Sequence, residues 1–366
     1  MAIQIKLRRD QSSIWDSDNP VLLAGEIGFQ YDSGTSQVGR FKIGNGHREW
    51  SRLPYFYAYQ DSSGAYPSSG GGSSGLTYAG DRALFGGGYA LSASGAINTI
   101  QYYDITTPGN ASDFGDLDQV LAYPGACSNS TYGVFAGGYW SQGNQNVIQY
   151  VTISTTGNTT DFGDLTSTVQ KSTGASNGTY GLWFRNLNNN VIEYITIAST
   201  GNATDFGDVS YTGSYIAGTG SNTTYVLLSG GYSGGYLNEI HYVTAATPGN
   251  STDFGDMTVG KLDHVGTSNA TYTLFGGNDN SSVDDVIDYV TTATPGNATD
   301  FGDLTVGADN LSAAANTDYA TFAGPNVNGS YEVINYVTIA TPGNATDFGD
   351  LLTGAYGGAG CSGAAS

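Results

Sequence analysis

Residues 296–304 read Gly-Asn-Ala-Thr-Asp-Phe-Gly-Asp-Leu, and the chain holds six close copies of this phrase in all. Their phenylalanines recur every 44 to 48 residues, at Phe114, Phe162, Phe206, Phe254, Phe301 and Phe348. A tyrosine precedes each phenylalanine by twelve positions, at Tyr102, Tyr150, Tyr194, Tyr242, Tyr289 and Tyr336. A period in the forties with strand-like content is typical of a β-propeller or another repeat array.

The composition agrees with a β-rich repeat protein. Glycine accounts for 55 of 366 residues, without the Gly-X-Y period of collagen. Abundant Ser, Thr, Asn, Tyr and Val, with little Leu or Lys, favour strands joined by many turns. No apolar run is long enough to cross a membrane and the N-terminus has no apolar signal segment, so we expect no membrane insertion.

Each repeat contains four strand-like pieces, here called a, b, c and d in chain order. In residues 261–305 we expect them at 263–267, 271–275, 286–292 and 300–304. Four antiparallel strands with a Gly-Gly after the second are the layout of a propeller blade. The repeat resembles a kelch-type blade, although Phe replaces the kelch Trp of strand d and the kelch Arg is absent. The doublets lie at Gly87-Gly88, Gly137-Gly138, Gly230-Gly231 and Gly276-Gly277.

The expected fold class is therefore all-β, with a six-bladed kelch-like propeller over residues 81–366. The first repeat lacks its own strand a, and the chain ends in a spare one at residues 359–362. We expect this piece to pair with residues 82–85. Such pairing closes the ring and removes the unpaired edges that promote aggregation.

Residues 1–55 form a separate unit, followed by a Gly/Ser-rich linker at residues 56–80. Ile3, Ile5 and Leu7 alternate with polar residues, as in a strand. About 55 residues with few apolar runs make a weak core. Such a unit gains stability by oligomerising or by docking on a larger body.

The motifs of this unit are spaced along its whole length. They are Arg8-Arg9, Trp15, Asn-Pro-Val-Leu at 19–22, Gly-Glu-Ile-Gly at 25–28, Phe-Lys-Ile-Gly-Asn-Gly at 41–46, Trp50 and Leu-Pro-Tyr at 53–55. The set resembles the N-terminal domain of bacteriophage tail fibres, of the kind that begins the major tropism determinant. The resemblance implies a β-prism-like domain that trimerises and attaches the protein to other tail or baseplate proteins. An insertion at residues 36–38 departs from the family pattern and lengthens one turn.

The charge of the chain limits its partners. The net charge of −21 lies almost wholly beyond residue 54, because residues 1–54 are close to neutral. So acidic a surface repels nucleic-acid phosphates and anionic membranes. We therefore expect no nucleic-acid partner.

Two cysteines, Cys127 and Cys361, occupy similar places in their repeats. The simplest interpretation is two small buried strand residues. A disulfide requires Cα atoms within about 7 Å of each other, and the sequence leaves that question open.

The repeated Asp-Phe-Gly-Asp allows several interpretations. It lacks the other elements of a kinase and the carboxylate density of an EF-hand, and it matches only the start of a sialidase-type Asp-box. We favour an Asn/Asp-rich turn whose side chains hydrogen-bond to the backbone, with Phe packed between blades.

Enzymatic activity is not expected. The propeller has few Arg for a sialidase and few His for a copper site, and no Asp stands out as one of a glycosidase pair. We expect no catalytic residue, no metal and no cofactor.

The connections between strands divide into two faces. The a–b and c–d turns share one face, called the turn face, and repeat almost unchanged. The b–c and d–a connections share the opposite face, called the loop face, and they vary. Variation marks a face that is free to specialise, although unconstrained drift would look the same. Exposed Tyr, Trp and Asn can stack on and hydrogen-bond to sugars, so the candidate ligand-binding residues are Tyr139, Trp140, Arg185, Tyr232, Tyr236 and Asn278.

The sequence thus predicts a bacteriophage tail fibre or tail-tip protein of the virion. Its N-terminal domain would hold the virion as a homotrimer, and its propeller would bind the host surface through a glycan. The alternatives are a structural virion protein of the baseplate or decoration type, without receptor binding, and a glycan-degrading enzyme.

Overall fold

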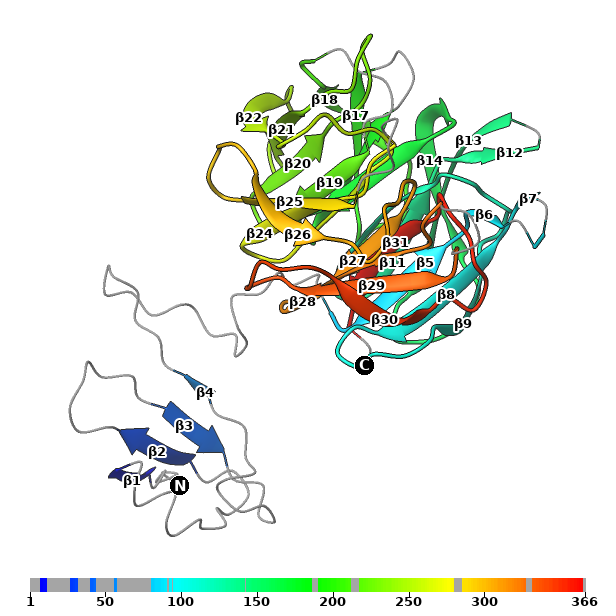
Figure 1. Ribbon diagram of the computed structural model, residues 1–366. Coiled ribbons are helices and arrows are strands. Elements are labelled where there is room, and N and C mark those ends of the chain that lie inside the picture. Colours follow the sequence, from blue (N-terminus) through cyan, green and yellow to red (C-terminus); the bar gives the residue numbers. More distant parts are fainter. Residues whose placement is uncertain are drawn as a thin grey trace. The chain divides into compact units, whose positions relative to one another are not determined.

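The computed structural model describes strands β1–β4 within residues 1–79. It also describes residues 80–364 apart from 91, 94, 142, 186–189, 212–216, 280–284 and 327–330. The chain divides into two compact units, Met1–Ser74 and Gly75–Ser366. All regular secondary structure in the described residues is β-strand (Figure 1), which confirms the all-β class.

The first unit contains one four-stranded sheet in the order β1-β2-β3-β4. The strands are β1 (Leu7–Gln11), β2 (Ile27–Tyr31), β3 (Arg40–Ile43) and β4 (Phe56–Tyr57). β1 and β2 are parallel, and the other pairs are antiparallel. β4 pairs with β3, so the sheet extends past residue 55. The rest of the predicted linker, up to residue 79, lies outside the described residues.

The second unit is a β-propeller of six blades, as the repeat predicts. Blade 1 consists of β31, β5, β8 and β9 (Ala359–Gly363, Arg82–Gly86, Thr99–Asp104 and Ser112–Asp116). Blade 2 consists of β10, β11, β13 and β14 (Gly125–Ser128, Tyr132–Ala136, Gly143–Thr152 and Thr160–Val169). Blade 3 consists of β15–β18 (Ser172–Ser176, Tyr180–Arg185, Val191–Thr196 and Thr204–Asp208).

Blades 4 to 6 follow the same plan. Blade 4 consists of β19–β22 (Gly218–Ser221, Tyr225–Ser229, Glu239–Thr244 and Thr252–Asp256). Blade 5 consists of β23–β26 (Val265–Ser268, Tyr272–Gly276, Val286–Thr291 and Thr299–Asp303). Blade 6 consists of β27–β30 (Ser312–Ala315, Tyr319–Ala323, Val333–Thr338 and Thr346–Asp350). Two short hairpins were not predicted: β6 (Tyr89–Ala90) with β7 (Gly95–Ala96), and β12 (Tyr139–Trp140) with the start of β13.

The two ends of the propeller segment meet in blade 1. β31 pairs antiparallel with β5, with Ala359 opposite Gly86 and Gly363 opposite Arg82. The last strand of the chain is therefore strand a of the first blade (Figure 1). This confirms the predicted closure, and it gives β5 a hydrogen-bonded neighbour on both sides.

The repeated phrase joins each blade to the next. In every repeat, the backbone N–H of the second Asp donates to the side-chain oxygen of the phrase Asn in the following blade, at 3.0 to 3.3 Å. The six donor–acceptor pairs are Asp116–Asn158, Asp164–Asn202, Asp208–Asn250, Asp256–Asn297, Asp303–Asn344 and Asp350–Asn110. Because the last pair returns to blade 1, these bonds form a closed circle, called here the inter-blade clamp. The predicted turn role of the phrase is confirmed, with the partner in the neighbouring blade.

The glycine of Asp-Phe-Gly is required by the closeness of the next blade. Gly207 has φ +148°, and a Cβ built on it would lie 2.5 Å from the carbonyl group of Gly249. The phenylalanine before it is buried in a layer shared by two blades. Phe114 of blade 1, for example, belongs to one cluster with Val151 and Ile153 of blade 2. The core is thus a series of layers between blades.

The inner strands β31, β10, β15, β19, β23 and β27 surround the propeller axis, each beside the next. Serines near the ends of these strands link neighbours, because their hydroxyls donate to the carbonyl of the preceding inner strand. Four such bonds run from Ser128 to Ser362, Ser176 to Ser128, Ser221 to Ser176 and Ser362 to Ala315. Cys127 and Cys361 are both buried in these strands with free thiols, as the simplest interpretation predicts.

Candidate functional site

The two faces of the propeller differ in what they expose. In the described residues, the exposed large apolar side chains are Tyr139, Tyr232, Tyr236, Val259 and Leu352. The strand order places every one of them in a b–c or d–a connection. All five therefore lie on the loop face. The turn face instead carries Asn-capped turns, in which Asn129 and Asn269 accept hydrogen bonds from backbone N–H groups.

Tyr139 and Trp140 lie on a hairpin that extends from blade 2. β12 pairs with the start of β13, with Tyr139 opposite Asn144 and Trp140 opposite Gly143, and the hairpin projects beyond the body of the propeller (Figure 1). Tyr139 is 41% exposed and also pairs with Ala122 through backbone bonds. Its backbone is therefore fixed while its ring faces solvent.

Tyr232 and Tyr236 form a compact pair on blade 4. Their rings contact each other edge to face, with centroids 5.9 Å apart, and they are 43% and 44% exposed. A tight turn at Gly234, with φ +74°, brings the two residues into a β-bridge. The pair and the blade 2 hairpin are separated by blade 3, so the structure does not bring the four predicted aromatic residues into one site.

For two of the predicted ligand-binding residues, Arg185 and Asn278, burial corrects the prediction that they are exposed to a ligand. Arg185 is 6% exposed and forms a buried ion pair with Glu193. Asn278 is fully buried, where its side chain accepts from the Leu262 N–H and donates to the Gly260 carbonyl. Both side chains stabilise the protein interior, and their loop positions alone had suggested exposure.

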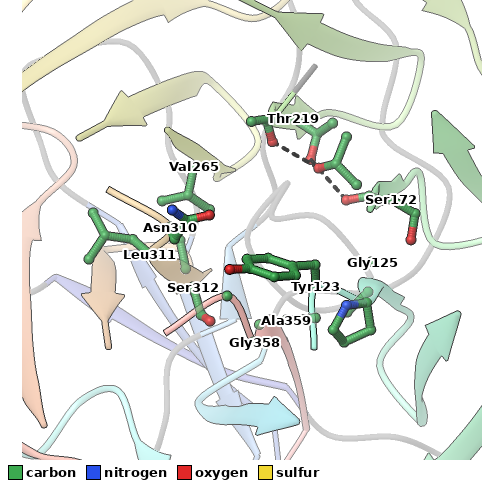
Figure 2. A pocket seen from close by; sticks show the side chains of 18 of the residues that line it. Tyr123, Gly125, Ser172, Thr219, Val265, Asn310, Leu311, Ser312, Gly358 and Ala359 are labelled. Carbon is green, nitrogen blue, oxygen red and sulfur yellow. Dashed lines mark hydrogen bonds between the residues drawn. The ribbon is translucent and has the colours of Figure 1, made fainter. Parts of the chain in front are cut away.

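A pocket at the axis opens where the inner strands begin, on the loop face. It has a volume of about 80 Å³ and is lined by the first residues of the inner strands. Figure 2 shows the ring of Tyr123 extending across it toward Asn310 and Leu311. A second cavity of about 70 Å³ lies farther along the same strands. The axis is therefore a narrow channel whose mouth is partly covered by one aromatic ring.

Residues at one equivalent position of the repeats line the mouth. In each repeat this position lies two residues before the one that aligns with Gly125. The strand registers place Tyr123, Lys171, Asp263, Asn310 and Gly357 there, and all five line the pocket. Three of them, Tyr123, Asp263 and Asn310, have φ between 51° and 56°. Non-glycine residues seldom adopt this conformation, and it is enriched at functional sites.

Lys171 connects these positions across the axis. Its ammonium group lies 2.5 Å from the Asp263 carboxylate, 3.0 Å from the side-chain oxygen of Asn310 and 4.9 Å from the centre of the Tyr123 ring. The other described cations of the propeller lie elsewhere. Arg185 and Lys261 are buried, and Arg82 donates to the carbonyl of Ile153.

The surroundings of the mouth are acidic despite Lys171. Burial, and then the charge of Asp263, raises the pKa of Asp279. Burial, and then the charge of Asp279, raises the pKa of Asp309. Three carboxyl groups around one ammonium group favour neutral or positively charged ligands over anions. The described residues contain no cluster of His, Cys, Asp or Glu suited to a metal ion.

Sequence reasoning missed the channel mouth because it examined the b–c connections and not the d–a connections. A signal was present. The position of Tyr123 changes chemical character from repeat to repeat, whereas the Ser and Asn turns of the opposite face stay constant. Aligning the repeats by their strand b tyrosines and inspecting this position would have drawn attention to it.

No protein-family model matches the chain, and no curated protein matches it significantly. In the described residues, no helix is suited to crossing a membrane.

Proposed function

We propose that the chain is a bacteriophage tail fibre or tail-tip protein whose kelch-like propeller binds the host surface through its loop face. The observation that carries the proposal is the concentration of exposed large apolar side chains on that face. Exposed apolar groups gathered on one side of a molecule are typical of an interaction surface.

The N-terminal motifs support the virion part of the proposal. Their resemblance to the tail-fibre attachment domain suggests a homotrimer docked on other tail or baseplate proteins. Three propellers on one trimer would act together, so a weak contact at each could give firm attachment. The acidic charge of the propeller favours a neutral glycan receptor over an anionic polymer.

Adsorption of virions to host cells tests the proposal. Virions carrying both Trp140→Ala and Tyr236→Ala should adsorb more slowly than wild type, while particle yield and the melting temperature of the purified chain stay close to the wild-type values. Each aromatic contact is worth on the order of 1 kcal/mol. Because three copies act together, the combined effect on adsorption should exceed that of one contact.

The matched control replaces residues on the same two blades but on the turn face. Thr156→Ala and Thr247→Ala change exposed side chains of the c–d turns and should leave adsorption unchanged. Asn129 and Asn269 are unsuitable as controls, because they cap turns. Equal adsorption of all variants and wild type would favour the structural virion protein instead.

A further inference from the structure

Four tyrosines meet beside the channel mouth. Tyr356, in the connection from blade 6 to blade 1, contacts Tyr89, Tyr331 and Tyr123, with ring centroids 5.5, 5.9 and 6.5 Å away. These partners come from the b–c loops of blades 1 and 6 and from the connection to blade 2. Four separate connections of the loop face thus converge on one aromatic group, called here the tyrosine platform.

The arrangement of the rings indicates which ligand they fit. The planes of Tyr89 and Tyr331 are inclined by 38° and 35° to that of Tyr356, so both rings are tilted against the central Tyr356 ring. A cage for a quaternary ammonium group requires rings arranged around an empty space. Here the other three rings each contact Tyr356, and all four tyrosines are half-buried. They therefore offer a partly exposed aromatic surface, suited to a flat, weakly polar molecular face.

Polar groups lie along one edge of this surface. Tyr123 belongs both to the platform and to the mouth, where Lys171 lies over its ring. Asp309, 6% exposed, accepts hydrogen bonds from Asn310 and Asn326 through Oδ2, while its buried Oδ1 has no hydrogen-bond partner among the described residues. Aromatic faces beside a few fixed donors and acceptors are the usual composition of a small-molecule site.

We propose that the tyrosine platform and the adjoining channel mouth bind a neutral pyranose ring, the terminal sugar of a surface glycan. The C–H groups on one face of a pyranose would lie on the tyrosine rings. Its hydroxyl rim would reach the ammonium, carboxylate and amide groups of Lys171, Asp263 and Asn310. The excess of carboxyl groups around the mouth disfavours acidic sugars. This inference rests on the proposed function. It names a ligand class and a site on the same loop face, in addition to the contacts of Trp140 and Tyr236.

Saturation-transfer NMR on the purified full-length chain tests the inference. The probes are the methyl pyranosides of glucose, galactose, mannose and N-acetylglucosamine, with methyl glucuronide as the acidic comparison and choline as the cationic one. At least one neutral pyranoside should bind, and the glucuronide should bind more weakly. Tyr356→Ala should weaken binding by about fivefold or more, as expected for the loss of an aromatic contact of about 1 kcal/mol.

Further variants separate a local effect from a folding defect. Tyr356→Phe keeps the ring and should retain most of the binding, whereas Lys171→Met should weaken it without altering the rings. Thr247→Ala removes an exposed side chain on the turn face of blade 4 and should leave binding unchanged. The melting temperature of each variant shows whether the propeller is intact.

Three results would overturn the inference: binding of choline alone, binding of no pyranoside, or pyranoside binding that Tyr356→Ala leaves unchanged. In each case the proposed function is decided separately, by the adsorption of virions that carry the Trp140 and Tyr236 substitutions.

Discussion

At the scale of single residues, departures from the repeat are matched by compensating residues in the next blade. A Cβ built on Gly181 of blade 3 would lie 2.4 Å from the sulfur of Cys127 in blade 2. At the preceding interface, a Cβ built on Gly133 would lie 3.1 Å from the sulfur of Cys361 in blade 1. Each cysteine thus fills the space that a glycine leaves, which accounts for two buried thiols that remain free.

This complementarity predicts coupling between Gly181 and Cys127. Gly181→Ala should lower the free energy of unfolding by about 1–3 kcal/mol, because the added methyl group overpacks the interface. Adding Cys127→Ala should recover part of the loss, with a coupling energy above about 0.5 kcal/mol. Urea denaturation of the two single variants and the double variant measures the cycle. Simple additivity of the two effects would refute this packing argument.

A buried histidine makes stability depend on pH. Burial, then the charges of Lys261 and Lys171, holds the pKa of His264 well below its usual 6.5. Below that pH the unfolded chain binds a proton at this site that the folded chain does not, so acid favours unfolding. Stability contributed by the neutral ring is present above about pH 6.5 and is lost as the pH falls toward the lowered pKa.

We therefore expect wild-type stability to fall between about pH 7.5 and about pH 5, and to fall less in His264→Gln. The comparison between the two proteins isolates this residue from other groups that titrate, such as Asp279 and Asp309. Urea denaturation at both pH values measures the difference. The same slope in both proteins would show that His264 does not contribute to it.

At the scale of elements, the repeated phrase is a connector between blades. Gly207 and Gly249 contact each other beside the Asp208–Asn250 bond of the inter-blade clamp, yet they differ in whether a side chain fits. Gly207 has φ +148° and no room for a Cβ, while nothing lies within 4 Å of a Cβ on Gly249. Gly207→Ala should lower the free energy of unfolding by about 2 kcal/mol or more. Gly249→Ala is the control, and thermal unfolding measures both variants. An equal decrease in melting temperature in the two variants would contradict the proposed contact.

The elements were largely predictable from sequence because the period is strict. In blade 5 the expected strand b at 271–275 and strand c at 286–292 differ by one residue or less at each end from Tyr272–Gly276 and Val286–Thr291. The loop face was harder to predict. Whether a loop side chain is buried depends on partners from other elements, such as Glu193 for Arg185 and Gly260 for Asn278. The tyrosine platform likewise joins residues far apart in sequence.

At the scale of the whole molecule, the ring is held by the pairing of its two ends. Removing residues 355–366 deletes β31 and leaves β5 without its partner on the axis side. The truncated chain should lose stability by roughly several kcal/mol, as for other large losses of core structure. A control lacking only residues 365–366 keeps the whole β31–β5 ladder. An unchanged melting temperature after the longer truncation would contradict closure through β31.

The central proposal is that the protein acts on the tail of a virion, with its propeller toward the host. Immunogold electron microscopy of purified virions, with antibody raised against the propeller, tests this proposal most directly. Gold at the tip of the tail or its fibres is the predicted result. Gold on the capsid, or no gold on intact particles that bind a control antibody, would contradict it.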